Sequence, residues 1–222
     1  RPTLENAQLC QSYECISVLS TPIDAALLQK LQEVGVRFLS TRTVGYDHID
    51  LAYARKIGIH IGNATYASES VADYTIMLIL MALRKMKLIL QSAVSQDYSF
   101  DAVLGSNLKG KTLGVIGTGA IGQTLIRHIA GFGCRILAYN PHPRKEMEQY
   151  VTYVDLNTLY QNSDIITLHV PLNDATYHLL NEAAFARMKP GVIIVNTARG
   201  PLIDNTALIA AIESGKVGAA AL

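Results

Sequence analysis

Residues 111–122, KTLGVIGTGAIG, decide the fold of this chain. The apolar run at 113–116 predicts a short strand, and three glycines follow it at the spacing GxGxxG. Gly117 permits a tight turn, Gly119 lets a pyrophosphate approach the backbone, and Gly122 lets the next helix pack close to the strand. Because a helix N-terminus offers free N–H groups and the positive end of its dipole, the stretch predicts a dinucleotide-binding turn.

Composition bounds the remaining possibilities. The chain has 222 residues, enough for one or two domains, with 50% hydrophobic and 17% charged residues, which is typical of a globular protein. A net charge of +1 creates no field that would attract nucleic acid or a membrane surface. We therefore expect neither nucleic acid nor membrane as a partner. The longest apolar run, residues 74–83, is too short to span a bilayer.

The cysteines indicate a reducing compartment. Cys10, Cys15 and Cys134 have neither metal-ligand spacing nor the even number of a disulfide framework. We expect free thiols, a cytoplasmic location and no metal site.

Residues 1–65 alternate between strand and helix patterns. Short apolar runs predict strands at residues 16–19, 37–40 and 59–62. Helices are predicted between them, at residues 24–34 and 49–57. Strands separated by helices imply βαβ units and a parallel sheet.

A long helical pattern follows at residues 70–91, with Ser70 and Asp73 at capping-box spacing. Its first half is nearly all apolar, so we expect it to be buried between layers or between domains. Residues 96–108 are polar and irregular.

The rhythm from residue 111 onward is again strand and helix. Further strands are predicted at residues 135–139, 165–169 and 192–196, and residues 218–222 resemble the opening of another strand. Helices are predicted at residues 120–131, 156–161, 182–188 and 205–214. Near-continuous apolar strands such as IITLHV fit a sheet that is covered on both faces.

Three further segments define a resemblance. They are RTVGYDHID at 42–50, LHVPL at 168–172 and NTARGPLID at 196–204. Together with the glycine turn, they resemble the D-isomer-specific 2-hydroxyacid dehydrogenases, and especially their D-lactate dehydrogenase branch. The resemblance implies an oxidoreductase that transfers a hydride between NAD and a small 2-keto or D-2-hydroxy acid, with pyruvate and D-lactate as the expected pair. Two alternatives stay open: another 2-keto acid, or a corepressor-like interaction protein that senses dinucleotides.

The resemblance also implies an α/β organisation in two domains. Residues 1–65 would form part of a flavodoxin-like substrate domain, and residues 66–222 a doubly wound Rossmann domain that is incomplete at its C-terminal end. We expect both ends of a longer protein to be missing, and a homodimer. The family's catalytic Glu and His would lie beyond residue 222.

Arg199 is the candidate catalytic residue. A guanidinium fork can grip both the carboxylate and the ketone of a 2-keto acid, and Arg199 is expected at the carboxyl end of a parallel strand, where α/β sheets bind ligands. The resemblance implies the same role. It further implies that the backbone of Val44 and Gly45 holds the substrate carboxylate, and that Tyr66 lines the substrate pocket.

The histidines of this chain are not expected to donate the proton that reduction requires. His169 has core-like neighbours and is interpreted as a packed strand residue. His48 is interpreted as a surface residue at a helix start.

The expected cofactor residues lie on the glycine turn and on the ends of the following strands. They are Gly117, Gly119, Ala120, Ile121, Gly122, Asn140, Val170, Pro171, Thr176, Thr197 and Ala198. Asn140 stands where NAD-binding sites usually carry a carboxylate, about 20 residues past the glycines. An amide does not repel a 2′-phosphate, and His142, Arg144 and Lys145 follow it. NADP is therefore kept open as a second cofactor, unless these basic residues form an ordinary solvated loop.

Overall fold

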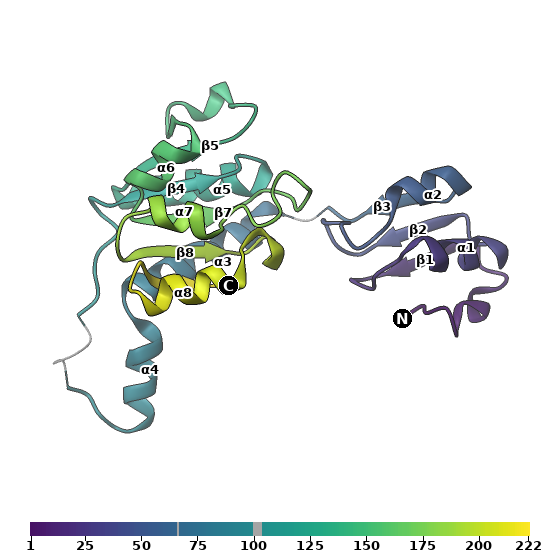
Figure 1. Ribbon diagram of the computed structural model, residues 1–222, viewed down its shortest axis with the longest axis horizontal. Helices are drawn as coiled ribbons and strands as arrows, with labels where there is room; N and C mark the ends of the chain where they lie inside the picture. The colour runs from purple at the N-terminus through teal and green to yellow at the C-terminus, as the bar shows by residue number, and fades with distance from the viewer. Residues whose placement is uncertain (66, 100–103) are drawn as a thin grey trace. The chain divides into compact units, whose positions relative to one another are not determined.

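The computed structural model describes residues 1–65, 67–99 and 104–222 (Figure 1). Contacts divide the chain into two units, Arg1–Ala67 and Ser68–Leu222.

The first unit is a small parallel sheet with helices. Its elements in chain order are η1 (Ala7–Cys10), β1 (Cys15–Val18), α1 (Ala25–Glu33), β2 (Phe38–Thr41), α2 (Leu51–Ile57) and β3 (His60–Asn63). The strands pair in the order β1-β2-β3. Asp24 and Asp50 cap the two α-helices, each accepting a backbone N–H three residues ahead. The strands and helices expected from the sequence are confirmed to within two residues.

The second unit contains a larger parallel sheet. Its strands are β4 (Thr112–Ile116), β5 (Arg135–Tyr139), β6 (Thr152–Tyr153), β7 (Ile165–Leu168), β8 (Val192–Asn196) and β9 (Val217–Ala221). They pair in the order β6-β5-β4-β7-β8-β9. The chain runs outward from β4 to β6 on one side and then crosses to β7 on the other. The sheet is therefore doubly wound, with its topological switch point between β4 and β7.

Helices cover both faces of this sheet (Figure 1). They are α3 (Ser68–Leu83), α4 (Met86–Val94), α5 (Ala120–Ile129), α6 (Leu156–Asn162), α7 (Glu182–Arg187) and α8 (Asn205–Glu213), with the 3₁₀ turns η2 (Ala130–Phe132), η3 (Lys145–Met147) and η4 (Gly200–Leu202). One buried cluster joins α3 and α5 to the sheet, and a second joins α6, α7 and α8 to it. The near-continuous apolar strands are thus explained by burial from two sides.

The long helix expected at residues 70–91 is wrong in two respects. It begins earlier, at Ser68, so Ser70 lies inside the first turn and is not its cap. It also breaks before α4, because Lys85 adopts a left-handed conformation with φ of 53°. Nor is α3 buried on all sides: Ile79 is fully buried, whereas Met77 is 43% exposed.

The end of the chain agrees with the expected strand, since β9 pairs in parallel with β8. The short strand β6 was not expected, because two residues give no periodicity. No helix in the described ranges is long and apolar enough to cross a membrane.

Candidate functional site

The register of the second sheet brings distant segments to one edge. Ile116 pairs with Tyr139 on one side and with Leu168 on the other, and Leu168 pairs with Asn196. The residues that follow these four strand ends therefore lie along the same carboxyl edge, beside the switch point. Open α/β sheets bind their ligands at this position.

Two glycines of the turn are required by the protein itself. Gly117 has φ of 101°, and a Cβ there would lie 2.6 Å from the carbonyl oxygen of His169. A Cβ on Gly122 would overlap the carbonyl oxygen of Gly117. Both residues are buried, so each allows a close approach of backbone to backbone.

Gly119 is different. It is exposed, has an ordinary φ of −72°, and a Cβ there would meet nothing within 4 Å. It is also the N-cap of α5 and provides no side-chain cap, so the first N–H groups of α5 remain available to a ligand. Exposed Ala120 and half-buried Ile121 form the first turn behind it. Open space before an uncapped helix N-terminus fits a dinucleotide pyrophosphate.

Asn140, which follows β5, is held by both ends of its amide. Its Oδ1 accepts the Thr118 N–H at 3.2 Å, and its Nδ2 donates to the His142 carbonyl at 2.6 Å. These two partners determine which amide atom is oxygen. The basic residues Arg144 and Lys145 are exposed beyond it.

The loop after β7 is closed by Thr176. Its hydroxyl donates to the carbonyl of Pro171 at 2.7 Å and accepts the N–H of Asn173 at 2.9 Å. Half-buried Val170 lies directly against the glycine turn, 2.9 Å from the place where a Gly117 Cβ would stand. Val170, one of the loop residues expected to contact a cofactor, therefore lies beside the glycine turn.

The turn after β8 is held by Asn196, which is 7% exposed. Its Nδ2 donates to the carbonyl of Arg199 at 2.8 Å, and its Oδ1 accepts the N–H of Ala198 at 3.0 Å. The half-buried Arg199 also donates from its guanidinium to the Ala198 carbonyl at 2.9 Å. Asn196 thus determines the direction in which the arginine leaves the sheet, a role that the sequence reasoning did not assign.

Thr197 is hydrogen-bonded to a residue of helix α3. The fully buried hydroxyl of Thr75 donates to the carbonyl of Val71 at 2.7 Å, so it accepts the proton of the Thr197 hydroxyl at 2.9 Å. Sequence reasoning missed Thr75. The available signal was the one threonine within the apolar run at residues 74–83.

Two histidines occupy local structural positions. The Nε2 of His169 lies 3.0 Å from the Thr167 hydroxyl, within hydrogen-bond distance. Burial lowers the pKa of His169 to about 4. It is therefore neutral from pH 5 to 8 and unsuited to donate a proton there. The Nε2 of His48 lies 3.3 Å from the Thr41 hydroxyl. His48 is half-buried and is therefore less exposed than the surface residue that the sequence predicted.

The expected substrate loop belongs to the first unit. Thr43 donates its hydroxyl to the Gly45 carbonyl at 2.6 Å, and Asn63 donates to the Val44 carbonyl at 2.8 Å. These bonds orient the peptide groups of the loop. Tyr66 lies outside the described residues.

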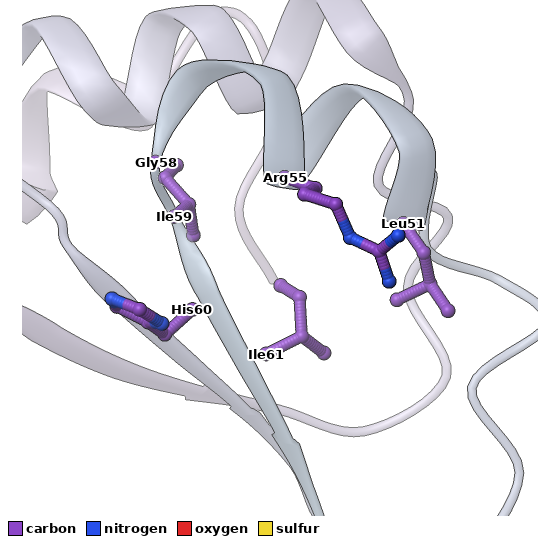
Figure 2. Close-up of a pocket in the computed structure, with 6 residues that line it drawn as sticks. All are labelled: Leu51, Arg55, Gly58, Ile59, His60 and Ile61. Atoms are coloured by element: carbon purple, nitrogen blue, oxygen red, sulfur yellow. The ribbon is translucent and has the colours of Figure 1, made fainter.

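A pocket of about 310 Å³ lies elsewhere in the first unit, along α2 and the edge strand β3 (Figure 2). It is lined by Leu51, Arg55, Gly58, Ile59, His60 and Ile61. None of the expected site residues borders it, so the candidate site remains the carboxyl edge of the larger sheet.

This edge, with its glycine turn and doubly wound sheet, defines an α/β dinucleotide-binding protein. Residues 76–222 match the family model described as D-isomer specific 2-hydroxyacid dehydrogenase, NAD binding domain. The chain belongs to this family.

Individual relatives agree with the family model. A D-specific alpha-keto acid dehydrogenase of Enterococcus faecium is 45% identical over 98% of this chain and 66% of the relative. An aromatic 2-oxoacid reductase of Clostridium sporogenes is 38% identical over 97% of this chain and 66% of the relative. The chain thus spans about two thirds of the length of these relatives.

A solved structure shares the fold. The D-lactate dehydrogenase of Aquifex aeolicus, complexed with NAD and lactic acid, superposes with a TM-score of 0.91 at 36% identity. The match covers 96% of this chain and 65% of that one.

Proposed function

We propose that the protein interconverts a small 2-keto acid and the corresponding D-2-hydroxy acid, with pyruvate and D-lactate as the pair and NAD as the cofactor. The observation that carries this proposal is that Arg199 follows β8 at the same sheet edge as the open turn at Gly119. The proposed substrate-binding arginine and the proposed pyrophosphate-binding turn thus lie at the same edge of the sheet.

Each part of the edge has a proposed task. The backbone at Gly119, Ala120 and Ile121 binds the pyrophosphate, and Asn140 faces the adenosine ribose. Thr197 and Ala198 are proposed to lie near the nicotinamide ribose, Val170 and Pro171 over the nicotinamide or the adenosine side, and Thr176 to contact the cofactor. Gly117 and Gly122 give the turn its shape.

Arg199 binds the substrate. Its fork holds the carboxylate, orients the 2-keto group and polarises the carbonyl, so that negative charge developing on oxygen is stabilised. The bound nicotinamide supplies the hydride. Asn196 holds the backbone of Arg199, and the backbone of Val44 and Gly45, with the Tyr66 side chain, completes the proposed substrate-binding set.

A different 2-keto acid is the second candidate. It is favoured by the similarity to a relative named for aromatic 2-oxoacids. A panel of pyruvate, glyoxylate, branched-chain and aromatic keto acids, assayed with NADH and NADPH, distinguishes the two candidates. Cofactor binding without turnover of any keto acid would instead support a corepressor-like protein.

NADP is proposed as a second cofactor. Asn140 carries no charge that would repel a 2′-phosphate, and its amide donates to a backbone carbonyl, which a carboxylate cannot do. The exposed basic side chains of Arg144 and Lys145 follow in the same loop.

A cytoplasmic homodimer is proposed as the working state. The three cysteines are free, as in a reducing compartment. Apolar side chains stay exposed on α3 and α4; they include Met77, Leu88, Ile89, Leu90 and Val94. Surfaces of this kind are typical of subunit contacts, and sedimentation of the protein tests the oligomeric state.

A further inference from the structure

Tyr153 connects three segments of the second unit through one hydroxyl. It donates to the Thr118 hydroxyl at 3.0 Å and accepts the backbone N–H of Arg144 at 3.1 Å. Tyr153 is half-buried on the short strand β6, and Thr118, between the first two glycines of the turn, is fully buried.

Thr118 is bonded at each of its polar groups. Its N–H donates to Asn140, its hydroxyl accepts from Tyr153, and its carbonyl accepts from the side chain of Gln123 at 3.0 Å. The loop that begins at Asn140 and reaches Arg144 is therefore attached to the glycine turn at both ends.

This attachment fixes the position of the backbone from which the basic side chain of Arg144 extends. Arg144 is exposed, and its long side chain loses conformational freedom when it binds an anion. A backbone held at its N–H limits that loss, because it fixes the point in the loop after Asn140 from which the side chain extends.

We propose that Tyr153 is a positioning residue for cofactor choice: by holding Arg144 and the glycine turn together, it favours binding of a dinucleotide with a 2′-phosphate. The proposal rests on the proposed function. Tyr153 acts through Arg144, and its hydroxyl is already shared between two protein partners.

The test compares binding of two cofactor fragments that differ only in the 2′-phosphate, 5′-AMP and 2′,5′-ADP, by titration calorimetry. Tyr153→Phe is expected to weaken 2′,5′-ADP about threefold to tenfold, the effect of one ordinary hydrogen bond, and to change 5′-AMP less than twofold. Tyr150→Phe is the matched control, since Tyr150 neighbours the same loop and its hydroxyl makes no hydrogen bond in the described ranges. The control is expected to bind both fragments as wild type does.

Two further variants separate positioning from simple structural support. Thr118→Ser keeps the hydroxyl acceptor and is expected to retain the wild-type ratio of the two affinities, whereas Thr118→Val is expected to reproduce Tyr153→Phe. In an Arg144→Ala background, Tyr153→Phe is expected to change the ratio no further, because the side chain that it positions is absent.

Several results would overturn the proposal. These are an equal loss of both fragments in Tyr153→Phe, an unchanged ratio, or a wild type that binds 5′-AMP but not 2′,5′-ADP. A wild type that binds neither fragment nor NADH contradicts the proposed function itself, and is thereby distinguished from failure of this inference alone.

Discussion

Replacing Gly119 with alanine separates the needs of the fold from the needs of the ligand. A Cβ at this position meets no protein atom within 4 Å, and φ of −72° is ordinary for alanine. The folded protein therefore has no steric reason to resist the change. Alanine restricts the unfolded chain, which stabilises by about 0.4–1 kcal/mol, but it is a poorer N-cap than glycine, so the free energy of unfolding is expected to change by less than about 1 kcal/mol.

Cofactor binding is expected to respond more strongly. The new methyl group occupies the space in which a pyrophosphate would approach the N–H groups at the start of α5 (Ala120–Ile129). Loss of one hydrogen bond to a charged group costs about 1.5–3 kcal/mol, which corresponds to NADH binding weaker by about 10- to 150-fold.

The assay is NADH titration by fluorescence, paired with thermal unfolding of each variant. Gly131→Ala is the matched control, because its Cβ also meets nothing within 4 Å and Gly131 lies in the turn that follows the same helix. It is expected to leave NADH affinity unchanged. Gly122→Ala gives the contrasting result, since its Cβ would overlap the Gly117 carbonyl and is expected to cost about 1–3 kcal/mol of stability or more.

Wild-type NADH affinity in Gly119→Ala would refute the reasoning, because the open space would then have no connection with the cofactor. A large drop in its melting temperature would refute the steric argument as well.

Three other changes test separate parts of the structure. Arg199→Lys removes the planar fork and is expected to lower kcat/KM for pyruvate by at least about 100-fold while NADH affinity holds; near-wild-type kinetics would exclude Arg199 as the substrate clamp. Asn140→Asp replaces the donor to the His142 carbonyl by an anion, and is expected to lower kcat/KM with NADPH about 5- to 150-fold more than with NADH; an unchanged ratio would contradict the role of the amide. Asp164 is partly buried, which raises its pKa, but a backbone N–H at 2.8 Å and Lys189 at 3.0 Å outweigh burial and hold the pKa below its ordinary value. The ionised Asp164 carboxylate therefore stabilises the folded protein above about pH 4, and this contribution is lost as the pH falls through the folded-state pKa of Asp164. Asp164→Asn is expected to cost about 1 kcal/mol at pH 7, and urea unfolding at pH 7 and pH 3 should show that the cost shrinks in acid.

Local patterns in the sequence were sufficient for most of the elements and for the glycine turn. The spacing of Gly117, Gly119 and Gly122 after an apolar run is a local pattern and could be recognised in the sequence, although the steric need for glycine at position 117 comes from His169 and appears only in the folded chain. The same holds for apolar strands with two covered faces and for the two helices of the first unit, although these begin one and two residues later than expected. Arg199 could be chosen for its guanidinium fork and its place at the end of a predicted strand.

The break in the long helix was not legible in the same way. The apolar pattern runs on through α4 (Met86–Val94), and Lys85 is a good helix former, so propensity favours continuity. The left-handed conformation at Lys85 belongs to the folded chain. The free-energy contribution of the helix propensity of lysine is small, and the tertiary structure overrides it at Lys85.

The sequence by itself thus determined the class of fold and predicted the glycine turn and Arg199 as site residues, because each pattern depends on residues within a few positions of one another. Only the tertiary structure decided which side chains hydrogen-bond to these segments and hold them in place. Thr75 and Thr197 are separated by 122 positions, and Tyr153 and Thr118 by 35, yet each pair is joined by a hydrogen bond. Hydroxyl groups carry no periodicity, and their partners are chosen by strand register and helix packing, which form only when the chain is folded.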